Sequence, residues 1–445
     1  MSGIKPAADK METMKVNSTI QPVTQGNMPM AQSNRLKMEQ SFSAALSRRA
    51  LLQTAAAGGI AMMGLGDAAG AVVSPQPPML FGCFGVMNAQ QAHAIHAQAT
   101  RFIFSIYDLP REIANAHKAI SGHGPMPWNF TMVQALHKAG IKVALTIGWG
   151  PWKPAKPLPL PAPDSARGKA WLKITRELVE LMGDHLYYLT LDNEPITYHY
   201  PIDWQGNTLD SKPVFAWYNA VAREVHHVKP ALPIASPAFN TLEEVVRYEN
   251  NPQSVKPWVR WAATRTHEMF AWANANELIS AVDLHPYVTS ASYMQAALAF
   301  ARRQTHKAML ATEWGQNSVL HTWINEPLNR RFSARWKLPH QQTNAAYVKA
   351  CKARPVQLEQ WNDFVNTAPL DHNFIPESYE AMRLNKLIMS AYFSYAQYPM
   401  VRPIDLLTPL YASCTVVRRN GRYQPNSHFL RSYIATAIRA AGRKA

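Results

Sequence analysis

The sequence predicts an α/β protein built as a (β/α)8 barrel (a TIM barrel) with a long insertion after the seventh strand. From about residue 79, apolar strand-like segments alternate eight times with helical segments, which is typical of parallel β/α units. The alternation fills about 360 residues, whereas a barrel without insertions needs about 250. The excess lies between residues 316 and 386, where a barrel needs only one helix.

The strands are expected at apolar segments bounded by turn residues. In chain order these cover residues 79–87, 100–108, 141–150, 185–195, 233–240, 280–288, 307–315 and 385–399. Helices are expected at 88–99, 130–140, 166–183, 214–228, 258–276 and 292–304, with a closing helix at 427–442. A hairpin that turns at Asn420-Gly421 is expected after the eighth strand.

Residues 79–445 are expected to form a single domain, because neither an internal repeat nor a second independent unit is evident. An apolar share of 47%, with 10% aromatic residues, argues against disorder in this part. The 316–386 insertion contains a helical piece near 341–353 and is expected over the mouth of the barrel, as a lid or a cleft wall.

Residues 47–71 have the features of an export signal. Arg48-Arg49 precede an apolar run at 54–66, and Ala69-Gly70-Ala71 follows as a small-residue cleavage site. The paired arginines resemble the twin-arginine signal of bacteria, which predicts the twin-arginine translocase as a partner and a periplasmic or secreted protein. The run is too short and too rich in glycine for a stable membrane span.

The polar stretch ahead of the arginines is long for such a signal, and residues 1–46 are expected to be disordered. Met38 opens a segment of ordinary signal length, so translation is expected to start there. The alternative is that residues 1–37 are a translated tail.

Charge and cysteines limit the choice of partners. The net charge is +16, and residues 1–71 hold seven Lys/Arg and four Asp/Glu, so about 16 − 3 = +13 remains on the mature chain. This charge either attracts an acidic polysaccharide or an anionic envelope surface, or it is solvated surface without a partner. Nucleic acid is disfavoured, because the basic residues are dispersed and no binding motif occurs. Cys83, Cys351 and Cys414 permit at most one disulfide and show no metal spacing, so unpaired buried thiols are expected.

Two of the predicted strands end on a glutamate. Glu194 follows Leu191-Asp192-Asn193 at the end of the fourth, and Glu313 precedes Trp314-Gly315 at the end of the seventh. The carboxyl ends of barrel strands meet at one face, where active sites lie. A protonated and an ionised carboxyl group facing each other are the parts needed to cleave a glycosidic bond. Either motif alone is equally well explained as a turn with a solvated carboxylate; together they favour a site.

Two other strand ends add candidate substrate-binding residues. His285-Pro286-Tyr287 ends the sixth predicted strand, and Trp149 ends the third. Trp149 and Trp314 are expected either to stack on sugar rings or to pack in the core. No strand end offers a histidine–aspartate cluster, so neither a metal nor a cofactor is expected.

These motifs resemble clan A of the retaining glycoside hydrolases, (β/α)8 barrels that include cellulase-like and mannanase-like families. In that clan an Asn-Glu pair after strand four supplies the acid/base and a glutamate on strand seven is the nucleophile; Asn193-Glu194 and Glu313 match these places in order. The resemblance implies that Asn193 binds the hydroxyl next to the reacting carbon and that His285 and Tyr287 stand beside the nucleophile. It covers roughly residues 80–440, and its specific part is a handful of short motifs.

The chain departs from the clan at two points. Many relatives end strand eight with a tryptophan that floors the sugar site, whereas this strand offers Tyr392, Phe393, Tyr395 and Tyr398. Arg101 is the candidate for a strand-two arginine that pairs with the nucleophile in cellulase-like members. It precedes FIFSIYD, however, and is therefore expected near the wrong end of its strand.

The sequence therefore predicts a retaining β-glycosidase that acts on an oligo- or polysaccharide, with carboxyl groups about 5–5.5 Å apart. A transglycosylase with the same residues and a non-catalytic polysaccharide-binding barrel are the alternatives. Glucans, mannans, xylans and galactans remain open as substrates, as do endo and exo action.

Overall fold

The computed structural model describes residues 78–86, 88–150, 159–198, 211–253, 256–354, 356–371, 373–392, 416–419, 422–425 and 428–442. These residues belong to one structural unit, Gln76–Ala445. The predicted export signal, the start at Met38, the Asn420-Gly421 turn, Cys414 and the aromatic residues Phe393, Tyr395 and Tyr398 lie outside the described residues.

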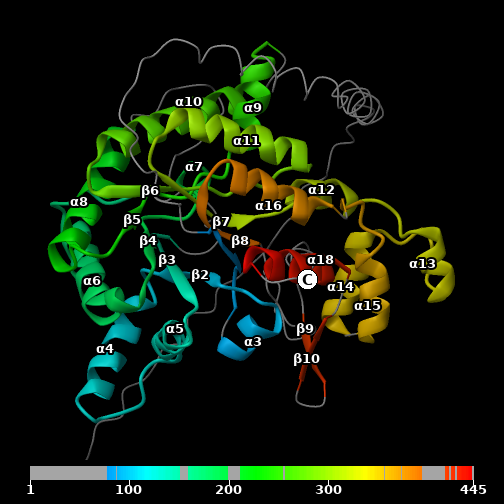
Figure 1. Ribbon diagram of the computed structural model, residues 1–445, viewed down its shortest axis with the longest axis horizontal. Helices are drawn as coiled ribbons and strands as arrows, with labels where there is room; N and C mark the ends of the chain where they lie inside the picture. The colour runs from blue at the N-terminus through cyan, green and yellow to red at the C-terminus, as the bar shows by residue number, and fades with distance from the viewer. Residues whose placement is uncertain are drawn as a thin grey trace, which may run out of the picture. The chain divides into compact units, whose positions relative to one another are not determined.

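An eight-stranded parallel sheet forms the centre of the fold (Figure 1). Its neighbours run in the order β1-β8-β7-β6-β5-β4-β3-β2, so from β2 to β8 each strand pairs with the next one along the chain, and β8 also pairs with β1. The strands are β1 (Leu80–Cys83), β2 (Ala99–Ser105), β3 (Lys142–Gly148), β4 (Tyr188–Thr190), β5 (Ile234–Ala235), β6 (Ile279–Asp283), β7 (Ala308–Trp314) and β8 (Leu387–Tyr392).

Backbone contacts between β1 and β2 nearly close the sheet into a barrel. Gln98 N donates to Phe81 O at 2.9 Å, and Gly85 N donates to Arg101 O at 3.4 Å. The strands approach so closely here that a Cβ on Gly82 would lie 2.1 Å from the carbonyl oxygen of Ala99. Glycine is therefore required at this position by the closure of the barrel.

Gly82→Ala is expected to lower the free energy of unfolding by about 3 kcal/mol, because the new methyl group meets backbone that cannot rotate away. Gly124→Ala is the matched control, since a Cβ there meets nothing within 4 Å. Urea unfolding of both variants measures the difference. Equal stability of the two variants would contradict the close approach of β1 and β2.

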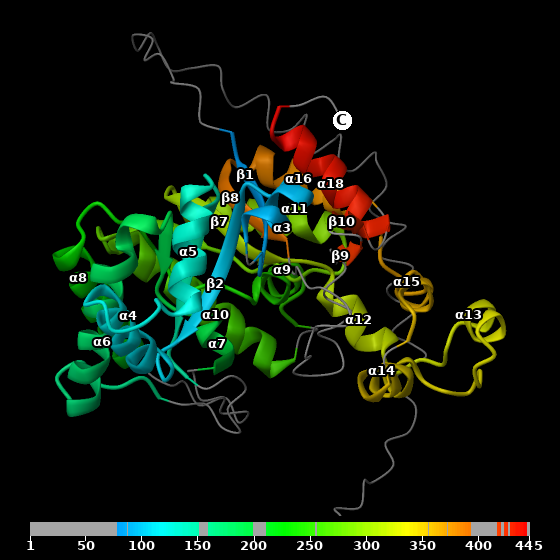
Figure 2. The same cartoon turned by 90° about the horizontal axis from the view of Figure 1, so that it is seen from below.

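Helices surround the strands, as Figures 1 and 2 show from two sides. Neighbours in this ring pack against each other, for example α6 on α8 and α11 on α16. The helices are α3 (Ala89–Ala94), α4 (Leu109–Ile120), α5 (Trp128–Lys138), α6 (Ala166–Met182), α7 (Pro195–Tyr198), α8 (Lys212–Val228), α9 (Leu242–Asn250), α10 (Pro257–Ala275), α11 (Ala291–Gln304), α16 (Phe374–Leu384) and α18 (His428–Ala440), with a 3-10 turn η1 (Gly183–His185).

The eight-strand barrel predicted from the sequence is confirmed, with shorter strands than expected. The hairpin is also confirmed: β9 (Val416–Arg419) pairs antiparallel with β10 (Arg422–Pro425). Helices α4 and α9 were not predicted. For α4 the signals were present, namely a proline in its first turn and the basic residues His117 and Lys118 in its last.

Among the described residues, five helices lie between β7 and β8. Of these, α16 packs against α11 and α18 and takes the place of the expected barrel helix. The other four are α12 (Asn317–Trp323), α13 (Arg330–Arg335), α14 (Asn344–Ala353) and α15 (Leu358–Val365). Their apolar side chains, Phe332, Tyr347 and Phe364 among them, form a cluster separate from the barrel core. Their predicted position over the mouth of the barrel stays a prediction.

Two further sequence predictions concern membranes and thiols. Among the described helices none is long and apolar enough to span a bilayer. Cys83 and Cys351 are buried free thiols, as expected for unpaired cysteines.

Glu244 in the first turn of α9 is a half-buried carboxyl group, and burial raises its pKa from 4.5 to about 7. The folded protein therefore holds a proton between pH 4.5 and 7 that the unfolded chain has released. The stability contributed by this proton is complete below pH 4.5 and is lost as the pH rises through 7.

Glu244→Gln is accordingly expected to raise the free energy of unfolding at pH 8 by about 2 kcal/mol and to change it little at pH 4.5. Unfolding at both pH values, with Glu326→Gln on the exposed surface as control, measures the effect. A gain that does not depend on pH would contradict the raised pKa.

Candidate active site

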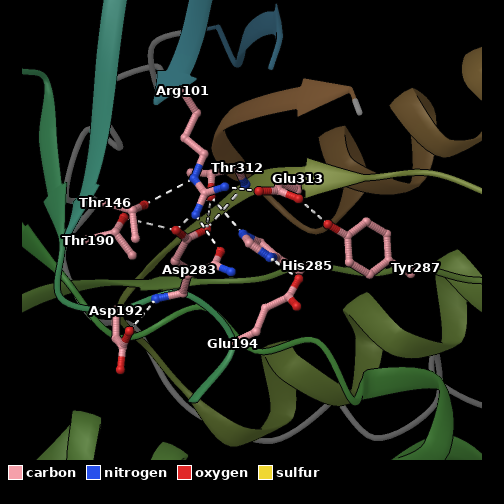
Figure 3. A network of polar contacts seen from close by, with 11 residues as sticks. Arg101, Thr146, Thr190, Asp192, Glu194, Asp283, His285, Tyr287, Thr312 and Glu313 are labelled. Atoms are coloured by element: carbon pink, nitrogen blue, oxygen red, sulfur yellow. Dashed lines mark hydrogen bonds and ion pairs between the residues drawn. The ribbon is translucent and has the colours of Figure 1, made fainter. Parts of the chain in front are cut away.

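The end of β4 carries the first predicted catalytic residue. Asp192, Asn193 and Glu194 leave the sheet after Thr190, and Pro195 begins the short helix α7. Glu194 has a φ of +49°, a left-handed conformation that costs a non-glycine residue roughly 1–3 kcal/mol. Such strain persists where surrounding contacts enforce it, and it directs the Glu194 carboxyl group toward the sixth and seventh strands (Figure 3).

Contacts on Asp192 hold this turn in place. Its Oδ1 accepts a hydrogen bond from Asn193 N at 2.7 Å, and its Oδ2 accepts one from the hydroxyl of Tyr218 on α8 at 2.6 Å. Ala238 N donates to the carbonyl oxygen of Asp192 at 3.0 Å. The turn is thus attached to both the next helix and the next strand end.

Glu313, the second predicted catalytic residue, lies one residue before the end of β7 and is buried. Its Oε1 forms an ion pair with Nη1 of Arg101, and its Oε2 accepts a hydrogen bond from the hydroxyl of Tyr287 (Figure 3). Both oxygens are therefore held, and the charge of the carboxylate is compensated by a fully buried guanidinium.

Arg101 reaches the site although it is the third residue of β2. Its Nε donates to Thr146 Oγ1 at 3.0 Å, and its Nη2 donates to Asn193 Oδ1 at 2.7 Å. Its expected position nearer the amino end of the strand holds, but the length of its side chain brings the guanidinium to the site. Arg101 spans from the middle of the barrel to the ends of β4 and β7.

His285, just after β6, lies between the two glutamates. Its Nδ1 is 2.9 Å from Glu194 Oε1, and its Nε2 is 3.1 Å from Thr312 Oγ1. Burial lowers the pKa of His285, and the nearby Arg101 charge acts in the same direction; the hydrogen bond to Glu194 opposes them. The ring is therefore neutral near pH 7.

One oxygen of Glu194, one ring nitrogen of His285 and one oxygen of Glu313 lie within 4.8 Å of one another. The sequence predicts these three residues at one face of the barrel, but their close spacing could not be predicted, because they come from three strands. The spacing of these three atoms would allow them to bind one cation. Here Arg101 already supplies a positive charge to Glu313, and both ring nitrogens of His285 have protein partners. The residues therefore fit a paired-carboxylate site better than a metal centre.

The two predicted sugar platforms belong to the core. Trp149 is 1% exposed, donates from Nε1 to Leu191 O at 2.6 Å and stacks on Trp171. Trp314 is fully buried and packs against Phe81 and Tyr392. A platform needs an exposed ring face, whereas both of these predicted substrate-binding indoles are packed inside the protein in this structure.

Sequence reasoning missed the polar residues inside the barrel. The only sign of them in the sequence was a polar side chain within an otherwise apolar strand segment. A polar side chain that is buried in such a strand needs a hydrogen-bond partner. They are Thr146 on β3, Thr190 on β4, Asp283 on β6 and Thr312 on β7, all fully buried.

Similarity to known proteins is found among solved structures. No family model matches the chain, and no curated protein matches it in sequence. Solved structures similar to it include an exo-β-1,4-mannosidase from an Opitutaceae bacterium (13% identity, 78% of this chain and 54% of that chain, TM-score 0.44). A β-glucosidase from Thermotoga maritima is 10% identical over 78% of this chain and 84% of its own, with a TM-score of 0.42.

A third match is an oligosaccharide-binding protein from Trichoderma gamsii, with 11% identity, 85% and 100% coverage and a TM-score of 0.37. The chain spans only 54% and 63% of the length of two matching enzymes, the mannosidase and a family 39 glycoside hydrolase from Bacteroides cellulosilyticus. At these identities and TM-scores the likeness carries no argument about activity. Any conclusion about function therefore depends on the site itself.

Proposed function

We propose that this protein is a retaining glycoside hydrolase that cleaves β-linked glycosides, with Glu313 as nucleophile and Glu194 as acid/base. The observation that supports it is the approach of the two buried carboxyl groups, with an oxygen of each within 4.8 Å of the other. Retaining enzymes hold their carboxyl groups about 5–5.5 Å apart, whereas inverting enzymes need roughly 6.5–9.5 Å to admit a water.

The unlike surroundings of the two groups support the division of roles. Glu313 lies against the Arg101 guanidinium, which favours the ionised carboxylate that a nucleophile requires. Glu194 contacts neutral His285 and has no cation beside it among the described residues, as a proton donor requires. The negative charge of ionised Glu313 also disfavours a second negative charge on the neighbouring Glu194.

In the first step a Glu313 oxygen attacks the anomeric carbon, the glycosidic C–O bond breaks, and Glu194 gives its proton to the leaving oxygen. In the second step Glu194, now a carboxylate, takes a proton from water. The resulting hydroxide displaces Glu313 and regenerates the free enzyme. Asn193 Oδ1 accepts a hydrogen bond from Arg101, which leaves the amide nitrogen of Asn193 to donate to the sugar hydroxyl next to the anomeric carbon.

A panel of β-glucans, β-mannans, xylans and galactans, incubated with purified protein and with Glu313→Gln at equal concentration, tests the proposal. Release of reducing sugar by the wild type and not by the variant is expected on at least one glycan. Glycan binding without release would favour the binding barrel. Products that appear only with an added sugar acceptor would favour the transglycosylase.

Export by the twin-arginine route to the periplasm or the outside of a bacterium is also proposed, on the signal in residues 47–71. A protein that folds before it crosses the membrane does not need disulfides, in agreement with its few cysteines.

A further inference from the structure

A buried series of hydrogen bonds begins at Asp283 and ends at Glu194 (Figure 3). Thr312 Oγ1 lies 2.8 and 2.7 Å from the two oxygens of Asp283 and 3.1 Å from His285 Nε2. His285 Nδ1 then meets Glu194 Oε1 at 2.9 Å. Asp283, Thr312 and His285 are fully buried, and Glu194 is 8% exposed.

The Asp283 end fixes the direction of the series. An ionised carboxylate only accepts hydrogen bonds, and three protein donors point at this one. They are Thr190 Oγ1 at 2.9 Å, Thr312 N at 3.2 Å and Thr312 Oγ1. The single hydroxyl proton of Thr312 is thus directed to Asp283, which leaves the oxygen of Thr312 as an acceptor toward His285.

The tautomer of His285 follows from this. Its Nε2 faces an acceptor and must carry the proton, so in the neutral ring Nδ1 is a lone pair. A lone pair at Nδ1 can pair with Glu194 Oε1 only when that oxygen carries a proton. The opposite tautomer would donate from Nδ1 and would pair with the carboxylate form of Glu194 instead.

We propose that Asp283 is a positioning residue that, through Thr312 and His285, holds the catalytic proton on Glu194. The inference rests on the proposed function, in which Glu194 is the acid. After the first step the Nδ1 lone pair faces an unprotonated oxygen of Glu194, so the arrangement also favours the return of a proton from water in the second step.

Other charged and titratable groups around Glu194 and His285 come from every neighbouring strand end. Arg101 on β2 and Glu313 on β7 form an ion pair, and Tyr287 bonds to Glu313. Asp192 on the β4 side is engaged by Tyr218. Arg101 disfavours a second positive charge on His285, whereas Glu194 and Asp283 favour one, and burial outweighs them.

Asp283→Asn tests the proposal, because an amide can donate to the oxygen of Thr312. The hydroxyl of Thr312 then turns to His285 Nε2, the ring proton moves to Nδ1, and the carboxylate form of Glu194 is favoured. The basic limb of the pH profile of kcat/KM, where the acid loses its proton, is expected to move down by about one pH unit. Glycosides with poor leaving groups should lose more activity than dinitrophenyl glycosides, which need little acid assistance.

Thr312→Val removes the hydroxyl at nearly constant volume, so the basic limb of its kcat/KM profile is expected to move away from the wild-type position. Thr312→Ser keeps a hydroxyl, and its basic limb is expected at the wild-type position. Thermal unfolding of each variant separates a folding defect from the effect on the acid. A pH profile that stays at its wild-type position in both Asp283→Asn and Thr312→Val would overturn the proposal.

A readout that does not need turnover is the tautomer of His285, from ¹⁵N NMR of histidine-labelled protein, with the signal assigned by its loss in His285→Gln. We expect the Nε2–H form in the wild type and the Nδ1–H form in Asp283→Asn. A wild-type Nδ1–H ring would overturn the proposal. If the tautomers are as expected but no glycan is cleaved, the hydrogen-bond series stands and the hydrolase function fails.

Discussion

Glu313→Gln is expected to lower kcat on a β-glycoside by at least about 10⁴-fold, the scale on which loss of a nucleophile acts in other covalent enzymes. The amide keeps the shape of the side chain but cannot attack the anomeric carbon. Steady-state kinetics with an activated aryl glycoside, together with circular dichroism to verify the fold, measure the effect.

Glu194→Ala provides the matched comparison. Because a good leaving group needs no proton, dinitrophenyl glycosides should still form the intermediate at Glu313, and added azide should restore turnover and yield a β-glycosyl azide. Azide added to Glu313→Ala should instead yield the α-azide, since it attacks the substrate directly. Near-normal hydrolysis by Glu313→Gln would end the assignment of the nucleophile.

Arg101→Met is expected to reduce the free energy of unfolding by about 3–5 kcal/mol, because it leaves the buried charge of Glu313 without a partner. The same change removes the donors to Thr146 and Asn193. Combining it with Glu313→Gln should recover part of the loss, since the uncompensated carboxylate is then gone. Urea unfolding of both single variants and the double variant gives the coupling between the two residues.

Arg335→Met on α13 is the control for an ion pair at the surface. Its side chain is 56% exposed and pairs with Glu359 and Asp363, so the expected loss is below about 1 kcal/mol. An Arg101 variant as stable as this one would contradict the buried pair.

The barrel could be predicted from the sequence because strand and helix alternate with clear turn signals. Glu194 and Glu313 could be predicted for a related reason: each follows an apolar segment, and the carboxyl ends of barrel strands converge. The ends of the strands could be predicted less accurately. The residues after β4 leave the sheet to form the turn at Glu194, although the apolar run continues through Leu191.

Arg101, His285 and Tyr287 could be named beside the glutamates only through the family resemblance, because their partners are distant in sequence. Arg101 and Glu313 lie on β2 and β7, and nothing near Arg101 in the chain indicates how far its side chain reaches. Asp283 resembled any polar residue in a strand until Thr190 and Thr312 were placed beside it. Trp149 could not be assigned either, since tryptophan suits both a sugar platform and a core.

The anomeric configuration of the first product is the most direct test of the proposed roles of the two facing carboxyl groups. With a β-glycoside that the protein cleaves, ¹H NMR spectra recorded before mutarotation should show the β-anomer first, because two displacements at one carbon, by Glu313 and then by water, restore the configuration. The α-anomer as first product would show a single displacement by water. It would contradict a covalent role for Glu313.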